Sequence, residues 1–172
     1  RRGGVRRARA APGGGAMSAP ASPRWQCVAF DALTPAELDA IYRARQQVFV
    51  IEQGCPYLDA DGVDPHCWHL AAWSTQQREP LAYARLVPPG VKYAEASIGR
   101  VITTSAARGT GLGRALVRRA VAEAEALFPD AGLRISAQAH LARFYGEVGF
   151  VSVGAEYLED GIPHIEMLRP AS

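Results

Sequence analysis

The sequence predicts an α+β fold with one domain over residues 25–170, in which strands at both ends of the chain contribute to a mixed sheet. The chain has 172 residues, of which 48% are hydrophobic and 21% charged, as is typical of a globular domain with a core of its own. Short apolar segments occur near both ends of the chain. Within residues 111–128, apolar residues recur at helical spacing. No apolar run approaches the roughly 20 residues of a membrane-spanning helix, so the pattern excludes membrane, fibrous and fully disordered classes.

Residues 1–24 are expected to form a disordered tail. They are rich in Arg, Gly and Pro, and residues 1–16 hold five arginines and no acidic residue. Met17 is a possible natural start. The net charge of +2 minus those five charges leaves −3, so the globular part is mildly acidic and does not favour nucleic-acid binding. Binding of nucleic acid by the tail is an alternative, which predicts that deleting residues 1–16 abolishes it.

The domain is expected to begin with a short strand over residues 25–30, followed by a helix. Thr34 and Glu37 have capping-box spacing, with Pro35 at the first helical position. A second short helix or loop is expected over residues 50–54. The first helix places these residues on related faces: Leu38, Ile41, Tyr42, Arg45 and Phe49.

An acidic loop and a hairpin are expected next. Residues 55–65 are rich in Asp, Pro and Gly, which favour turns. Residues 68–73 and 81–87 are apolar runs separated by a polar turn over 74–80, a pattern typical of a hairpin. Residues 96–103 are rich in β-branched residues and predict a further strand.

The second half of the domain is expected to hold a long helix and a final hairpin. Residues 111–128 place apolar side chains at helical spacing and Arg and Glu on the opposite side. The sequence shows no internal repeat. The remaining expected elements are a strand over 133–138, a short helix over 139–147 ended by Gly149, and strands over 151–157 and 164–168 around a turn at 159–161.

The junction over residues 101–113 carries the clearest chemical signal. A β-rich strand leads into a Gly-x-Gly-x-Gly turn at residues 109–113, which opens the long helix. The first amides of a helix lack intrahelical partners and carry the positive end of its dipole, and glycine lets backbone approach an anion closely. The turn is therefore a candidate phosphate cradle, to which Arg108 and Arg114 add positive charge.

Two familiar nucleotide-binding motifs do not fit this turn. A P-loop needs Lys and then Ser or Thr after the last glycine, but Gly113 is followed by Arg114. A dinucleotide site needs Gly-x-Gly-x-x-Gly and an acidic residue at the end of the next strand, and neither is present. A glycine-rich turn without any ligand is the remaining alternative to the phosphate cradle.

The sequence contains Arg108-x-x-Gly111-x-Gly113 after the β-rich strand and, further on, Ala139–Phe150, which ends in Phe-Tyr-x-x-x-Gly-Phe. These two motifs resemble motifs A and B of the GNAT superfamily of N-acetyltransferases. Further strings, among them VFVIEQGCPYLDADGVD, IGRVITTSAARGTGLG and YLEDGIPHIEM, are similar to the ElaA-like branch, and the resemblance covers about residues 25–169. It implies the GNAT acyl-CoA N-acyltransferase fold, a mostly antiparallel central sheet flanked by helices, with acetyl-CoA as cosubstrate.

The resemblance also implies which residues carry the reaction. The amine would attack the thioester directly, without a covalent enzyme intermediate. Tyr145 occupies the position of the general acid that protonates the leaving thiolate, and the alternative is that it is only a core aromatic residue. An amide of Val101 or Ile102 would face the thioester carbonyl oxygen. The residues expected to bind acetyl-CoA are Val101, Ile102, Thr103, Arg108, Gly109, Thr110, Gly111, Leu112, Gly113 and Arg114.

The general base and the acceptor are less well determined. Glu52, His69 and His164 are candidates for the base and for acceptor binding, His66 and His140 are weaker ones, and a water chain is an alternative. The acceptor is expected to be an amine-bearing small molecule or protein amine, with no nucleic acid or membrane partner and with a possible homodimer. The loop carboxylates would attract a protonated amine or would simply be solvated: Glu52, Asp59, Asp61 and Asp64.

Metal and disulfide chemistry are not expected. Cys55, His66, Cys67 and His69 do not have standard zinc spacing. The odd number of cysteines, with Cys27 as the third, fits reduced thiols in a cytoplasmic protein. The sequence therefore predicts a cytoplasmic acetyl-CoA-dependent N-acetyltransferase, and the alternative is a non-catalytic acyl-CoA-binding or regulatory protein of the same fold.

Overall fold

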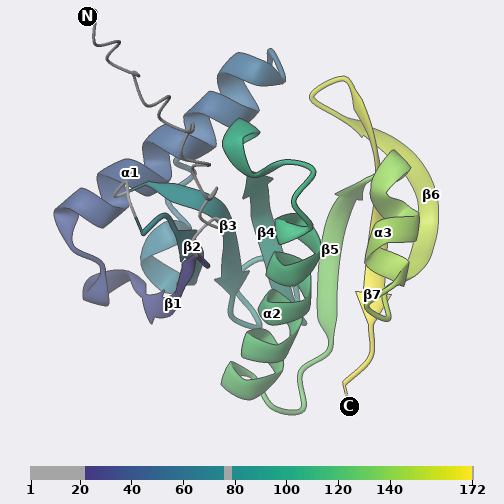
Figure 1. Cartoon of the computed structure of the whole chain (residues 1–172). Helices are drawn as coiled ribbons and strands as arrows, with labels where there is room; N and C mark the ends of the chain where they lie inside the picture. Colours follow the sequence, from purple (N-terminus) through teal and green to yellow (C-terminus); the bar gives the residue numbers. More distant parts are fainter. Residues whose placement is uncertain (1–21, 76–78, 172) are drawn as a thin grey trace, which may run out of the picture.

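A computed structural model of the chain describes residues 22–75 and 79–171 (Figure 1). The expected tail at residues 1–21, and part of the turn expected over 74–80, lie outside the described residues. In the described part of the chain, no helix is both long enough and apolar enough to cross a membrane.

Seven strands form one sheet in the order β1-β2-β3-β4-β5-β7-β6. All neighbouring strands are antiparallel except β4 and β5, which are parallel. This arrangement confirms the predicted mixed, mostly antiparallel sheet. The strands are β1 (Arg24–Ala29), β2 (Trp68–Trp73), β3 (Pro80–Val87), β4 (Ala96–Thr103), β5 (Leu133–Gln138), β6 (Val151–Glu159) and β7 (Ile162–Arg169).

The helices are α1 (Pro35–Gln46), α2 (Leu112–Leu127) and α3 (Ala142–Gly146). The capping box at α1 is confirmed, because the backbone N–H of Glu37 donates to the Thr34 hydroxyl and that of Thr34 donates to the Glu37 carboxylate. Residues 50–54 do not form a separate helix, since α1 continues directly as a π-helical segment, Gln47–Glu52. No Pro or Gly interrupts the chain there before Gly54.

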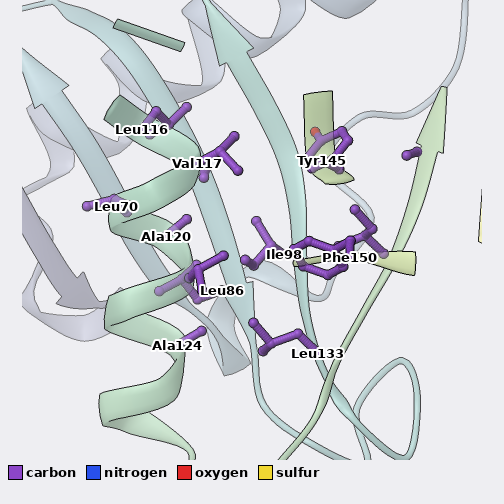
Figure 2. Packing of buried hydrophobic residues seen from close by; sticks show 14 of the residues in the cluster. Leu70, Leu86, Ile98, Leu116, Val117, Ala120, Ala124, Leu133, Tyr145 and Phe150 are labelled. Carbon is purple, nitrogen blue, oxygen red and sulfur yellow. The ribbon is translucent and has the colours of Figure 1, made fainter. Parts of the chain in front are cut away.

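Helices cover both faces of the sheet. The alternation of β2 and β3 sends Leu70 and Leu86 to one face, where they join a core with α2 and α3, and sends Trp73 and Tyr83 to the other face, against α1. Figure 2 shows the first core, in which Leu116, Val117, Ala120 and Ala124 of α2 face the strands. The helical spacing predicted over 111–128 is thus the buried stripe of α2.

Candidate functional site

The two parallel strands at the centre of the sheet separate after a short paired stretch. β4 and β5 pair only at Ala96 with Leu133 and at Ser97 with Arg134, although β4 continues to Thr103 and β5 to Gln138. A cavity of about 390 Å³ includes residues of both strands beyond this point. Figure 1 shows that both strands point toward the end of the molecule where the β6–β7 hairpin turns.

A bulge in β4 lies beside this cavity. Arg100 has a φ of 52°, and the register between β3 and β4 shifts so that neither Arg100 nor Val101 has a partner in β3. Val101 lines the cavity, whereas Ile102 is buried on the α1 face of the sheet. Of the three β4 residues predicted to contact the cosubstrate, Val101 is therefore the one whose backbone the fold leaves outside the ladder and beside the cavity.

The glycine-rich turn after β4 has an open, left-handed backbone. Gly109 and Gly111 have φ values of 76° and 84°, and a Cβ atom on either would meet nothing within 4 Å. Gly111 is the N-cap of α2, and no side chain caps that helix end. The first amides of α2 therefore have no side-chain cap, and the glycines before them leave space beside the backbone, an arrangement that fits the diphosphate of a CoA thioester.

The two arginines expected to add positive charge to this turn, Arg108 and Arg114, already have carboxylate partners. Arg108 pairs with Glu52 from the π-helical segment and donates through Nε to the carbonyl of Thr103 at 3.2 Å. Arg114 donates to Glu147, just after α3, at 3.2 Å. Both side chains stay largely exposed, so a bound phosphate would compete with weak surface ion pairs.

The other turn residues predicted to bind the cosubstrate offer backbone rather than side-chain groups. The hydroxyl of Thr110 donates to the carbonyl of Ala107 at 2.7 Å, which closes the turn on itself. Leu112 packs against the core under α2, and Gly113 lies where a Cβ would make an ordinary 3.5 Å contact with Thr103. What these residues can offer an anion is their peptide N–H groups.

Tyr145 comes from α3 and lines the same cavity as Val101. Its ring is 8% exposed and is held edge-on by Phe144 and Phe150, at centroid distances of 5.3 and 6.1 Å. Figure 2 shows its hydroxyl oxygen turned away from Phe150. Within the described residues, this hydroxyl has no hydrogen-bond partner, and burial raises the pKa of Tyr145 to about 12. The phenol therefore keeps its proton at neutral pH and is free to donate it.

His164, near the start of β7, lines the same cavity. Its Nδ1 is 2.8 Å from the carbonyl oxygen of Ile162, and its ring stacks on Tyr157. Because a carbonyl oxygen only accepts, Nδ1 must carry the hydrogen. The neutral imidazole then has its lone pair on Nε2, the tautomer required of a base acting through that atom.

The other two candidates for the base lie elsewhere. Glu52 lines a separate groove between α1 and the start of β3. His69 is 1% exposed and has both ring nitrogens occupied: Nδ1 contacts the Tyr83 hydroxyl at 2.8 Å and Nε2 the carbonyl of Asp64 at 3.1 Å. Burial also lowers the pKa of His69. The structure thus contradicts His69 as an acceptor-binding residue and makes it part of the core.

The structure buries two of the four carboxylates that were expected to be solvated or to attract an amine. Asp59 and Asp64 are 4% and 1% exposed. Arg45, which is fully buried, contacts both of them at 2.8 and 2.7 Å. Asp59 and Asp64 are therefore neutralised inside the protein, which contradicts a solvated or amine-attracting role for these two. Glu52 and Asp61 stay exposed, and each forms an ion pair with an arginine.

Arg85 and Arg100 also bind carboxylates of this loop. With Arg45 and the three aspartates Asp59, Asp61 and Asp64, they form an ionic cluster. Arg85 binds Asp61 and Asp64 at 2.7 and 3.0 Å. Arg100, from the β4 bulge, forms an ion pair with Asp59 at 2.8 Å, although its Nε does not point along a hydrogen bond there. The cluster thereby fastens the bulge to the loop over residues 55–65.

Several cavity residues carry chemistry that local sequence signals do not indicate. Ser136 contacts the hydroxyl of Tyr157 at 2.6 Å and donates to Glu159 at 2.9 Å, which links β5 to the β6–β7 hairpin. Lys92, in the turn between β3 and β4, also lines the cavity. Lys92 is the only lysine in the sequence, a signal that counting residues can find.

No metal centre is built from the part of the chain described, since no three His, Cys, Asp or Glu side chains gather there as ligands. Cys67 is buried with its thiol contacting the carbonyl of Val63 at 3.2 Å, and burial raises its pKa to about 11. It therefore behaves as a core thiol rather than as a ligand.

Sequence comparison shows which known proteins this chain is similar to. Residues 74–169 match the family model for the acetyltransferase (GNAT) domain. A UPF0039 protein of Synechocystis is 44% identical over 144 residues, which cover 84% of this chain and 93% of the relative. The ElaA protein of Escherichia coli is 39% identical over 147 residues, which cover 84% of this chain and 95% of ElaA.

Solved structures give the same relationship. An acyl-CoA N-acyltransferase from Pseudomonas aeruginosa has a TM-score of 0.82 at 47% identity and covers 86% of this chain, with 99% of that protein covered. The crystal structure of E. coli ElaA has a TM-score of 0.80 at 38% identity, with 86% of this chain and 99% of ElaA covered. The similarity therefore extends over nearly the full length of both proteins.

Proposed function

The chain belongs to the GNAT acetyltransferase family, and from this premise we propose that it transfers an acetyl group from acetyl-CoA directly to a primary amine. The resemblance to ElaA is confirmed by both sequence and structure. The observation that carries the proposal is the cavity between β4 and β5, because it holds Val101, Tyr145 and His164 around one space. The proposed acceptor is an amine-bearing small molecule or a protein amine.

The donor would be held mainly by backbone. The uncapped amides at the start of α2 suit the diphosphate of the carrier, and the open space over Gly109 and Gly111 admits it closely. The bulge at Arg100 leaves the backbone of Val101 available to the carbonyl oxygen as that oxygen gains charge. Both groups are fixed by the fold before the substrate binds, so little reorganisation is needed.

Proton transfers would be divided between two side chains. When bound, acetyl-CoA supplies the electrophilic thioester carbonyl. The protonated phenol of Tyr145 donates to the departing sulfur, and its ring is already fixed by Phe144 and Phe150. The unprotonated Nε2 of His164, directly or through water, accepts the proton that the amine must lose. Acid and base thus come from different elements, α3 and β7, that line one cavity.

The test is release of CoA thiol from acetyl-CoA in the presence of small amines, polyamines, amino sugars and peptide N-termini. The proposal expects an N-acetylated product with at least one of these classes and uptake of acetyl-CoA in calorimetry. Tight uptake with no product on any acceptor would favour the alternative, a non-catalytic acyl-CoA-binding protein. No uptake by the folded chain would contradict both functions.

A further inference from the structure

Lys92 is placed where the proposed reaction needs an amine. It lies in the turn between β3 and β4 and lines the cavity that also contains Val101, Tyr145 and His164. Every other Lys or Arg position in the sequence is arginine, which has no nucleophilic amine. The single side-chain amine of the chain therefore faces the space in which acyl groups would be transferred.

The ammonium of Lys92 is not held by a counter-ion. In the described part of the chain it has no hydrogen bond or ion pair, and it lies over the ring of Tyr93, at 5.1 Å from the ring centroid. A lysine without a fixed partner keeps the freedom of its four-carbon stem, so it can swing into the cavity. This contrasts with Arg100 of the cavity wall, which forms ion pairs with Asp59 and Asp61.

The surroundings of Lys92 also favour its neutral form. Although the residue as a whole stays exposed, desolvation by neighbouring atoms lowers the pKa of Lys92. The charges of Arg100 and Arg85 lower that pKa further, while Glu159 and Asp61 raise it. The net effect is a larger fraction of unprotonated amine at neutral pH than an ordinary surface lysine has, and only that fraction is nucleophilic.

We propose that Lys92 is itself an acyl acceptor, so that the protein acylates its own side chain intramolecularly. This inference rests on the proposed function for its donor. The Nζ lone pair attacks the thioester carbonyl, a C–N bond forms, the C–S bond breaks, and CoA leaves as its thiol. The proton lost by Nζ passes to solvent or to the leaving sulfur, so atoms and electrons balance without any further reactant.

Acylation would change the cavity in two ways. It converts a cation into a neutral amide, which leaves the carboxylate of Glu159 without the positive charge of Lys92, and it adds atoms to the cavity wall. Because an amide does not pass its acyl group on to another amine, the modified Lys92 is an end product. It would therefore alter turnover of external acceptors rather than serve as an intermediate.

The experiment incubates the full chain with acetyl-CoA and follows the intact mass and the tryptic digest. Unmodified chain is cut after Arg85, Lys92 and Arg100, whereas acetylated Lys92 resists trypsin and yields one fragment spanning 86–100. We expect one acetyl group on that fragment, appearing at least about tenfold faster than on urea-unfolded chain, because the fold holds amine and thioester together. The rate per molecule should not depend on protein concentration.

Matched variants separate this proposal from chemical and intermolecular acetylation. Lys92→Arg keeps the charge and should lose the label while binding acetyl-CoA with unchanged affinity. Tyr145→Phe, which keeps Lys92, should label more slowly, and mixing it with Lys92→Arg should not restore the rate. Restoration in the mixture, a rate that rises with protein concentration, or equal labelling of the folded and unfolded chains would overturn the proposal.

The outcome also separates this proposal from the function on which it rests. Absence of label on Lys92 together with uptake of acetyl-CoA would overturn self-acylation alone. Absence of both label and uptake would overturn the proposed donor as well.

Discussion

Arg45 donates through Nη1 to Oδ1 of Asp64 at 2.7 Å, and both side chains are buried, at 0% and 1% exposure. Arg45 lies in α1 and Asp64 at the end of the loop over residues 55–65, so the contact fixes that loop against the helix. Arg45 reaches Asp59 in the same loop through Nε. One buried guanidinium therefore organises the loop that borders the cavity.

Arg45→Met should destabilise the protein by about 3–5 kcal/mol, because it leaves the carboxylates of Asp59 and Asp64 buried with fewer partners. Urea unfolding followed by circular dichroism measures the change. Arg43→Met on the same helix is the control, since its partners Asp39 and Glu79 are exposed, and it should change stability little. Equal effects of the two variants would contradict the structural role of Arg45.

The stability of the protein should decline in two stages as the pH falls. Burial lowers the pKa of His69 in the folded protein. The contribution of neutral His69 to stability is therefore complete above the unfolded-state pKa of about 6.5 and is lost as the pH falls below that value. Burial raises the pKa of Asp64, but Arg45 and Arg85 outweigh this and lower it, so its contribution is lost below about pH 4.

Unfolding free energies measured in urea between about pH 8 and pH 3 test whether the stability falls on acidification. His69→Gln should remove the first stage and leave the second, because Gln does not titrate. A stability that rises on acidification through either range would contradict the buried, neutral His69 and the ionised Asp64.

Much of the fold can be predicted because its signals are local. β2, β4 and β5 begin and end at the predicted residues, since each is an apolar or β-branched run bounded by polar or turn residues. The start of α1 is equally clear from Thr34 and Glu37, whose reciprocal hydrogen bonds need only residues three positions apart. The continuation of α1 into a π-helical segment is not predicted, because local signals do not distinguish the two helices.

The buried ionic cluster could not be predicted, because its partners are distant in sequence. Asp59 and Asp64 have the local pattern of a solvated acidic loop, but their cations come from α1, β3 and β4. The burial of His69 depends in the same way on Tyr83, which lies on the neighbouring strand. Tertiary packing decides which charged groups face a cavity and which neutralise one another. Local sequence patterns do not contain this information.

Gly111→Ala should weaken acetyl-CoA affinity by at least about fivefold, a loss near 1 kcal/mol. The added Cβ meets no atom within 4 Å, so the effect comes from the φ of 84°, which an L-residue adopts only at a cost of about 1–2 kcal/mol. Calorimetry gives the affinity. Gly154→Ala, on the edge strand β6 with a φ of 78° and equally open space, is the matched control and should lose stability but keep affinity.

Tyr145→Phe should lower kcat by about tenfold or more and leave acetyl-CoA affinity unchanged, because the variant loses only the proton donor. The ring contacts with Phe144 and Phe150 do not involve the hydroxyl, so the fold of the site is retained. Steady-state rates measure kcat, and calorimetry measures the affinity for acetyl-CoA. The control is Tyr42→Phe, which removes a hydroxyl that contacts Asp64 outside the cavity and should keep full turnover. An unchanged kcat in Tyr145→Phe would exclude the role of Tyr145 as the acid.

His164→Gln should lower kcat/KM by about tenfold to a hundredfold, because glutamine offers no basic nitrogen to accept the proton of the amine. In the wild type the Ile162 carbonyl holds Nδ1–H, which leaves the Nε2 lone pair free for this role. Steady-state rates measure the change. His140→Gln is the control, since His140 is exposed and does not line the cavity. If His164→Gln keeps the wild-type kcat/KM, the proton leaves the amine by another route, and Ser136 and Glu159 become the residues to test next.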